Sequence, residues 1–315
     1  MINMVGTKIK KIFLTGGTGM VGRNILESKI VDSYDIIAPP RSELDLFNKD
    51  AVYKYIKKLK PDLIIHAAGK VGGIKANLHN NYLFYLENLT IGNNVLLSAA
   101  ELGVINFLNL GSSCIYPRDI DRPIKESDLL SGFLEPTNEG YALAKAAVAK
   151  LGEYINESNP NLKYRTIIPC NLYGSYDSFD PKLAHMIPAV IMRISEAKKN
   201  NTDINMWGSG NARREFMHIS DFTDFIKHLI PNFQYLPKYL NVGIGKDYSI
   251  KDYYSTIAKV IGFEGSIIPD HSQPIGMLKK QVDITLLDKF GWKSSIGLEE
   301  GIQATYEYYK GLNYE

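Results

Sequence analysis

A glycine-rich turn between a short apolar strand and a helix constrains this chain most. The run KIFLT at 11–15 predicts a strand, which leads into GGTGMVG at 16–22 and then a helical pattern at 23–28. The G-x-x-G-x-x-G spacing lets a backbone approach a pyrophosphate at the positive end of a helix, although turns of purely structural use look similar. The turn therefore predicts a dinucleotide site, with candidate residues Gly16, Gly17, Thr18, Gly19, Met20 and Val21.

Strand and helix patterns alternate through the first half of the chain. Further strands are expected at 34–38, 63–66, 105–110 and 164–168, and helices at 50–60, 82–102 and 137–157. Such alternation predicts right-handed crossovers and a parallel sheet with helices on both faces. We therefore expect an α/β fold, a Rossmann-type doubly wound sheet with a smaller C-terminal α/β substrate-binding lobe. The expected dinucleotide-binding domain is 1–174, to which 216–245 returns, and the substrate domain is mainly 175–315.

Composition limits the partners of the chain. Its 36 basic and 34 acidic residues give a net charge of +2, which offers no electrostatic reason to expect a nucleic acid partner. No window approaches 18 apolar residues and the N-terminus lacks the apolar core of a signal peptide, so we expect no membrane segment and a cytoplasmic location. The two cysteines predict reduced thiols, and the histidines and cysteines show no metal-ligand spacing.

A second constellation combines Ser112 and Cys114, at the carboxyl end of an expected strand, with Tyr141 and Lys145 on an expected helix. Four residues apart, the phenol and the ammonium share one helical face. The positive charge should lower a phenol pKa of about 10 toward neutrality, a change of roughly 3 units or about 4 kcal/mol, and so prepare a proton donor. An exposed helix face is the alternative interpretation.

The end of the second expected strand bears on the choice of nicotinamide cofactor. An acidic residue there would bind the ribose hydroxyls of NAD, whereas an arginine suits the 2′-phosphate of NADP. The strand ends IIAPPR at 36–41, without a carboxylate, so NADPH is favoured with Arg41 as the phosphate partner. The alternative is that Arg41 is a solvated turn residue. Ala67 and Ala68 follow the third expected strand at the same edge of the sheet, and they are further candidates for cofactor binding.

The whole pattern resembles the GDP-L-fucose synthase family of extended short-chain dehydrogenase/reductases. Besides the glycine turn and the Tyr-x-x-x-Lys pair, the resemblance rests on motifs along almost the whole chain: KVGGI at 70–74, LGSSCIYP at 110–117, LEPTN at 134–138, NLYG at 171–174, HMIP at 185–188, WGSG at 207–210 and REF at 214–216.

The resemblance implies a GDP-4-keto-6-deoxyhexose substrate that is epimerised at C3 and C5 and then reduced at C4 with NADPH. Tyr141, Lys145 and Ser112 would serve the reduction, while Cys114 as a thiolate base and His185 as the opposing acid would serve the epimerisation. The guanidinium of Arg214 can grip a diphosphate through two parallel bonds. The resemblance further implies a homodimer built on helices of the sheet domain, around Tyr82 and Thr137.

The remaining site residues follow from the same resemblance. Cofactor contacts are expected from Lys70, Lys145, Pro169, Asn171, Leu172 and His185, and substrate contacts from Ser113, Asn171, Arg193, Trp207, Arg214 and Lys280.

The chain also departs from the family. Its glycine turn has Gly17 and Thr18 where a His-Arg pair is typical, which bears on the preference for NADPH. Three hypotheses therefore stay open. The favoured one is the bifunctional epimerase/reductase, and the second is a C4-reductase or 5-epimerase/reductase for another GDP-4-keto sugar, such as a heptose or a dideoxyhexose like colitose. The third is a non-catalytic dinucleotide-binding regulatory protein, which would be expected to lack Tyr141 or Lys145.

Overall fold

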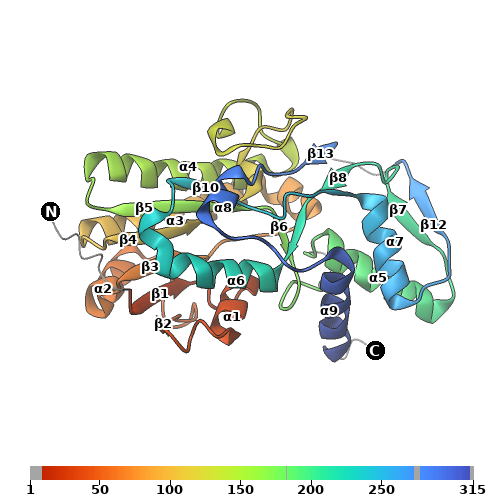
Figure 1. The fold of residues 1–315 in the computed structure, drawn as a ribbon, viewed down its shortest axis with the longest axis horizontal. Helices are drawn as coiled ribbons and strands as arrows, with labels where there is room; N and C mark the ends of the chain where they lie inside the picture. The colour runs from red at the N-terminus through yellow and green to blue at the C-terminus, as the bar shows by residue number, and fades with distance from the viewer. Residues whose placement is uncertain (1–8, 182, 273–276, 313–315) are drawn as a thin grey trace.

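A six-stranded parallel sheet forms the centre of the molecule (Figure 1). The computed structural model describes residues 9–312 apart from 182 and 273–276, so the parts of the two expected domains at 1–8, 182, 273–276 and 313–315 lie outside it. The strand order is β10-β5-β4-β3-β1-β2, with bounds β1 Lys11–Thr15, β2 Asp35–Ile37, β3 Leu63–His66, β4 Asn106–Leu110, β5 Lys163–Pro169 and β10 Tyr239–Val242. The predicted α/β fold class is confirmed.

Helices cover both faces of this sheet. They are α1 Met20–Glu27, α2 Lys49–Leu59, α3 Ile74–Glu101, α4 Glu139–Ser158 and α6 Ile219–Leu229, with α8 Thr285–Phe290 against β10. Side chains alternate across β1, so Ile12 and Leu14 enter one core with Phe222 of α6, while Phe13 enters the other with Val52 of α2. The inner strand β1 is therefore buried on both sides, as a doubly wound sheet requires.

The chain order reverses between β1 and β3, because β2 lies on one side of β1 and all later strands lie on the other. Thr15 and His66 are register partners at the carboxyl ends of these strands. A crevice outside the carboxyl ends at such a switch point is the usual ligand site of an open parallel sheet. The glycine turn follows β1 directly, so the fold places it at this edge.

A smaller lobe packs beyond the carboxyl edge (Figure 1). Its helices are α5 Met186–Asn200, α7 Ile250–Ile261 and α9 Leu298–Gly311, around a separate core that includes Ile191, Tyr253 and Ile302. Its short strands are β7 Ile204–Trp207, β8 Arg213–Arg214, β11 Tyr248–Ser249, β12 Ile267–Asp270 and β13 Lys279–Lys280, while β6 Asn171–Tyr173 and β9 Phe216–His218 pair with each other. The chain crosses between sheet and lobe more than once, since β10 pairs with β5.

One helix boundary differs clearly from the sequence prediction. We expected the third helix to begin at Tyr82, but α3 begins at Ile74 and contains a break at Asn80, where φ is −137° and ψ is 30°. The stretch before Tyr82 is rich in asparagine, which favours local side-chain bonds over regular helix. Asn77 shows this, because its side-chain amide donates to the carbonyls of Gly72 and Gly73. The apolar helical pattern is therefore interrupted although the helix is present.

Candidate functional site

The glycine turn has the shape of a phosphate cradle. Gly16 has φ of +75°, and a Cβ there would lie 2.7 Å from the backbone nitrogen of Ala68. A Cβ on Gly22 would lie 2.2 Å from the carbonyl oxygen of Gly16, so the first turn of α1 can approach the loop this closely only with glycine. Gly19 is the N-cap of α1, and no acidic residue occupies the first turn. The backbone N–H groups and the helix dipole are thus suited to a dinucleotide pyrophosphate.

The neighbouring strand ends complete this edge. Thr15 Oγ1 lies 2.8 Å from Nδ1 of His66 and accepts a hydrogen bond from Ala68 N at 3.3 Å, which fixes the Ala67–Ala68 backbone beside the turn. Pro169 ends β5, and Asn171 and Leu172 lie in β6. The Asn171 amide donates to the Glu215 carbonyl at 3.1 Å, which fixes β6 against the lobe.

Arg41 and Lys70, the two cationic candidates for the cofactor, have different surroundings. The side chain of Arg41 is 77% exposed, lies 3.7 Å from the Asp45 carboxylate and stacks over Phe47. Lys70 forms a 2.6 Å ion pair with Glu87 of α3. The Arg41–Asp45 pair is exposed and contributes little to stability, so Arg41 can exchange Asp45 for a phosphate at small cost.

Ser112 and Tyr141 lie together as predicted from the sequence. Ser112 follows β4 and caps a short 3₁₀ turn (Ser113–Ile115), and its hydroxyl is hydrogen-bonded to the phenol of Tyr141 on α4. The predicted fall in the pKa of Tyr141 is wrong for this structure. Burial raises that pKa, the nearby Cys114 raises it further, and the Ser112 bond only partly opposes them. Tyr141 therefore keeps its proton, as a donor must.

Lys145 is held by a backbone carbonyl, and its charge does not lower the pKa of Tyr141. Its Nζ donates to the carbonyl of Leu110 at 3.0 Å, and burial lowers its own pKa to about 8. His66 lies close enough that burial and the Lys145 charge together lower the histidine pKa to about 3. The ammonium is thus anchored to the end of β4, and His66 stays neutral beside it.

Cys114 lies in a setting that favours the thiolate. Its sulfur accepts hydrogen bonds from Lys280 Nζ at 3.3 Å and from the Asn138 amide at 3.2 Å, and its backbone N–H donates to Ser112 Oγ. Burial opposes ionisation, but the Lys280 charge and the hydrogen bonds outweigh it, so the pKa of the thiol falls below its ordinary value. Lys280 was expected to contact substrate, and the structure places it on the sulfur.

His185 is the N-cap residue of α5, on the lobe side of the site. Its Nδ1 lies 3.4 Å from an Asp177 oxygen. Burial lowers the pKa of the imidazole, but Asp177 and then the charge of Cys114 raise it, and the net shift is upward. Because the two charges interact, the thiol from the sheet domain and the imidazole from the lobe form one electrostatic unit.

The expected substrate residues fall into two groups. Arg214, on β8, interacts electrostatically with Cys114 and Glu135, and burial lowers its pKa. Ser113 is 3% exposed beside the thiol turn. Arg193 instead donates to the Tyr254 hydroxyl at 3.1 Å and to the Asn205 carbonyl, and the Trp207 backbone also bonds to that hydroxyl. Arg193 and Trp207 thus share a cluster in the lobe that does not include Cys114.

Sequence reasoning assigned no role to Asn138, Asp177 or Glu215. Asn138 lies in the LEPTN motif, where only its spacing from Tyr141 could have indicated that it faces Cys114. Asp177 was one of several polar residues in a loop, and Glu215 followed the expected diphosphate ligand Arg214. None of these sequence positions indicates burial, which the structure shows for Asp177 at 8% and Glu215 at 1% exposure.

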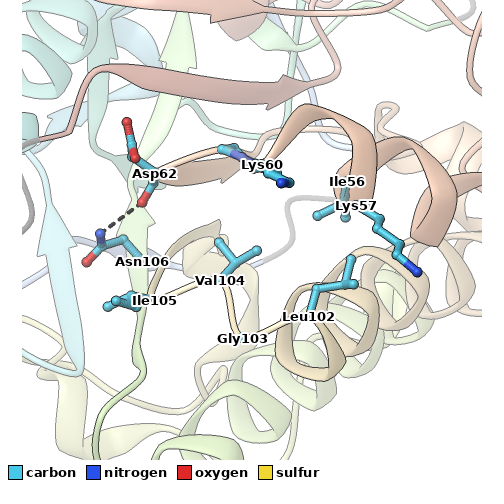
Figure 2. A pocket seen from close by; sticks show the side chains of 10 residues that line it. Ile56, Lys57, Lys60, Asp62, Leu102, Gly103, Val104, Ile105 and Asn106 are labelled. Carbon is cyan, nitrogen blue, oxygen red and sulfur yellow. Dashed lines mark hydrogen bonds between the residues drawn. The ribbon is translucent and has the colours of Figure 1, made fainter.

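A cavity of about 350 Å³ lies at the opposite edge of the sheet (Figure 2). Asp62 precedes β3 and Asn106 begins β4, and the Asn106 amide donates to the Asp62 carbonyl at 2.9 Å across its wall. These are the amino ends of parallel strands, whereas the glycine turn and Ser112 lie at the carboxyl ends. The cavity is therefore separate from the candidate site.

Two further observations concern the described residues alone. Within 9–312, apart from the gaps given above, no three His, Cys, Asp or Glu side chains form a group that could hold a metal ion. In the same part of the chain no helix combines the length and the apolar character needed to cross a membrane.

Comparison with known proteins agrees with this geometry. The model of the NAD dependent epimerase/dehydratase family matches residues 12–245. The chain is 49% identical to the GDP-L-colitose synthase of Yersinia pseudotuberculosis over 95% of this chain and 97% of that one. It is 45% identical to the GDP-L-fucose synthase of Azorhizobium caulinodans over 96% and 97% of the two chains.

A solved structure extends the comparison to the cofactor. A GDP-mannoheptose C4 reductase from Campylobacter jejuni with NADP bound superposes with a TM-score of 0.86 at 30% identity, covering 96% of this chain and 99% of the other. This chain belongs to the NAD dependent epimerase/dehydratase family and, within it, to the family of the GDP-L-fucose and GDP-L-colitose synthases.

Proposed function

We propose that this enzyme converts a GDP-4-keto-6-deoxyhexose to a GDP-deoxysugar by epimerisation at C3 and C5 and reduction at C4. The observation that supports this most strongly is the pairing of a thiol whose pKa is lowered with an imidazole whose pKa is raised. They come from the two sides of a site that also contains the Ser112–Tyr141 pair. Inversion at carbon needs a base on one face and an acid on the other, whereas a simple C4 reduction needs only a proton donor to the C4 oxygen.

In the epimerisation, the Cys114 thiolate removes the proton from the carbon next to the C4 ketone. The electron pair moves to the C4 oxygen, and the enolate is stabilised by hydrogen bonds from Ser112 and Tyr141. His185 then delivers a proton to the opposite face of the same carbon, and Asp177 holds its ring. The thiol ends protonated and the imidazole neutral, so solvent exchange must reset both before the second centre reacts.

In the reduction, the same oxygen site is used again. A bound nicotinamide cofactor would supply C4 with a hydride, that is, one hydrogen with two electrons. Tyr141 donates a proton to the C4 oxygen, and its raised pKa keeps that proton available until the oxygen becomes basic. Lys145 stays cationic below about pH 8, and we assign it to the cofactor side of the site.

NADPH fits the residues at the switch point. The glycine turn would hold the pyrophosphate, Ala67 and Ala68 would flank the cofactor, and Arg41 would pair with the 2′-phosphate, since β2 ends without a carboxylate. Glycine at 17 lets this turn pack against the end of β2, because a Cβ there would lie 2.7 Å from the Ala38 Cβ. Lys70, Pro169, Asn171, Leu172 and His185 are the remaining contacts that we assign to it. We propose that no metal takes part.

The GDP-sugar would extend from the residues around Cys114 into the lobe. Arg214 is our candidate for the diphosphate, because its guanidinium can form two parallel bonds to phosphate oxygens. Ser113 and Lys280 would contact the sugar ring beside Cys114, and Asn171 would contact it from β6. Arg193 and Trp207 would reach the nucleotide through the cluster around Tyr254.

A second candidate is favoured by the 49% identity to a GDP-L-colitose synthase. A dideoxyhexose substrate without a hydroxyl at C3 would need inversion at C5 alone. The same Cys114–His185 pair would then work once per turnover, and the reduction would be unchanged. The two candidates differ only in the substrate and in the number of centres that exchange hydrogen with solvent.

We also propose that the enzyme is a cytoplasmic homodimer. Apolar side chains are exposed along α3 and α4, with Tyr82 at 70%, Leu86 at 53%, Leu143 at 40% and Tyr154 at 56%. Exposed apolar residues on two packed helices suit a four-helix interface between two copies. The free thiols of Cys114 and Cys170 suit a reducing compartment.

The proposed function is tested by NADPH oxidation with two substrates, GDP-4-keto-6-deoxy-D-mannose and its 3-deoxy counterpart. We expect turnover of the first to exceed that of the second, and the reverse would favour the second candidate. Tyr141→Phe should lower kcat by roughly 10² to 10⁴ with little change in NADPH binding. Tyr154→Phe, on the exposed face of the same helix, is the matched control. Failure of both substrates would contradict the proposal.

A further inference from the structure

Glu215 is a buried carboxylate that joins three segments of the chain. It is 1% exposed and lies between β8 and β9. One oxygen accepts the backbone N–H groups of Ile244 at 2.7 Å and Gly245 at 2.8 Å, and the other accepts that of Val282 at 2.8 Å. Burial raises the pKa of this group to about 7, with the backbone bonds opposing the rise. Burying a carboxylate is costly, and here the three backbone N–H groups offset part of that cost.

The bonds of Glu215 determine where β13 lies. Its own backbone N–H donates to the carbonyl of Lys280 at 3.2 Å, while its side chain holds Val282, two residues further on. β13 runs parallel to β8, with Lys280 opposite Arg214. The backbone around Lys280 is therefore fixed from both sides by one residue.

Alternation along the two short strands sends their side chains to opposite sides. Arg213 and Lys279 face Asp247, at 2.8 and 3.8 Å. Lys280 faces the other way, with Nζ 3.3 Å from Cys114 Sγ, and the Arg214 charge also acts on that thiol. A shift of β13 by one residue would replace Lys280 by its neighbour, so the alignment of this strand determines which lysine reaches the sulfur.

The surrounding backbone is shaped for this carboxylate. A Cβ on Gly243 would lie 2.4 Å from the Glu215 oxygen that binds Ile244 and Gly245. Glycine at 243 therefore allows the loop to approach closely enough for both N–H groups to donate. Asn171 donates to the Glu215 carbonyl from the other side, which connects the residue to β6.

We propose that Glu215 is a positioning residue that holds Lys280 against the Cys114 thiol. It touches neither substrate nor cofactor in this account, and it acts through the alignment of β13. The inference rests on the proposed role of Cys114 as the base of the epimerisation. The charges that act on the thiol are those of Lys280, His185 and Arg214, with the phenol of Tyr141 nearby.

Glu215→Gln tests this with little change of shape. The amide oxygen of the glutamine can still accept the N–H groups of Ile244 and Gly245. Its NH₂ group would then face the Val282 N–H, and two donors cannot bond to each other. Val282 is therefore released, and with it the backbone that positions Lys280. The readout is the pH profile of Cys114 alkylation by iodoacetamide without substrate, with peptide mass spectrometry separating Cys114 from Cys170. We expect alkylation at pH 7 to slow roughly fivefold and the profile to move to higher pH, as for Lys280→Met.

Two further variants make the result decisive. Gly243→Ala displaces the carboxylate without altering it and should move the profile in the same direction. Asp247→Asn removes a buried carboxylate from the opposite side of the same strands and should leave the profile unchanged. A folded Glu215→Gln or Gly243→Ala protein with the wild-type profile would overturn the proposal, as would an equal shift in Asp247→Asn. Because no substrate is present, failure of the proposed function would show only in the turnover assay.

Discussion

Asp177 lies beneath His185, with one carboxylate oxygen 3.4 Å from the imidazole Nδ1. The Asp177 side chain is 4% exposed and the His185 side chain 40%, so the carboxylate is buried beside a ring that is partly exposed. The upward shift in the pKa of His185 places the imidazolium nearer to neutral pH than its burial alone would allow. An acid for the face opposite Cys114 thereby becomes available under ordinary conditions.

Asp177→Asn should remove this support. The pKa of His185 would fall because burial is no longer opposed by the carboxylate, and the imidazolium would be lost at lower pH. We expect solvent exchange at the epimerised carbon to drop about tenfold at pH 7 and its decline with rising pH to begin earlier. Asp180→Asn, in the same loop but exposed, is the control. An unaltered pH profile in Asp177→Asn would contradict the assigned role.

Lys145 should set the alkaline limit of the reduction. Its pKa is lowered to about 8, so the ammonium is present below that pH and is lost above it. His66 beside it has a pKa of about 3 and does not titrate in this range. We expect kcat for reduction to fall above about pH 8 in the wild type and to stay level to pH 9.5 in Lys145→Arg, though at a lower value. If kcat of Lys145→Arg also falls above about pH 8, a group other than Lys145 sets the alkaline limit.

The sequence predicted the local parts of this molecule well and the distant contacts poorly. The bounds of β1 and β3 agree with the predicted ones because short apolar runs end there in glycine or alanine turns. Ser112 and Tyr141 were brought together correctly, because a strand end and the following helix are neighbours in such folds. Cys114 and Lys280 are 166 residues apart, and their contact depends on how the lobe closes on the sheet.

Electrostatics was the least predictable part of the site. Tyr-x-x-x-Lys suggested a lowered phenol pKa from helical spacing, but spacing contains no information on burial or on competing partners. The Leu110 carbonyl holds the ammonium and burial raises the phenol pKa. Glu215 could not have been singled out for a related reason, since its three backbone partners come from segments that are distant in sequence.

Glu153 should stabilise the sheet edge in a pH-dependent way. From α4 it accepts hydrogen bonds from Lys150, Lys238 and Tyr239, the last at 2.7 Å, and although burial opposes it the pKa falls to about 2. This stabilisation is complete above the unfolded pKa and is lost as the pH falls from about 4.5 toward 2.

Glu153→Gln should therefore lower the free energy of unfolding by about 1–2 kcal/mol at pH 7, since water partly screens the lysines. The difference from the wild type, measured by urea denaturation, should shrink below about pH 4. Glu157→Gln on the exposed face of the same helix should have little effect. A difference that stays constant between pH 7 and pH 3 would exclude the ionic contribution.

The exposed apolar face of α3 and α4 should form the dimer interface. Leu86→Glu places a charge in its middle and should convert a dimer into a monomer at micromolar concentration, measured by sedimentation velocity. Tyr235→Glu, at a residue that is 71% exposed on another surface, should leave the dimer intact. A wild-type monomer, or a dimer that survives Leu86→Glu, would place the interface elsewhere or exclude it.

The central claim is that Cys114 and His185 invert C3 and C5 of the sugar before C4 is reduced. Each inversion exchanges the hydrogen on that carbon with solvent. The most direct measurement is turnover of GDP-4-keto-6-deoxy-D-mannose with NADPH in heavy water, followed by location of deuterium in the product by NMR. The account predicts deuterium at both C3 and C5 in the wild-type product, and a reduced sugar with neither label from Cys114→Ser. A wild-type product that is reduced at C4 but contains no deuterium at either carbon would contradict it.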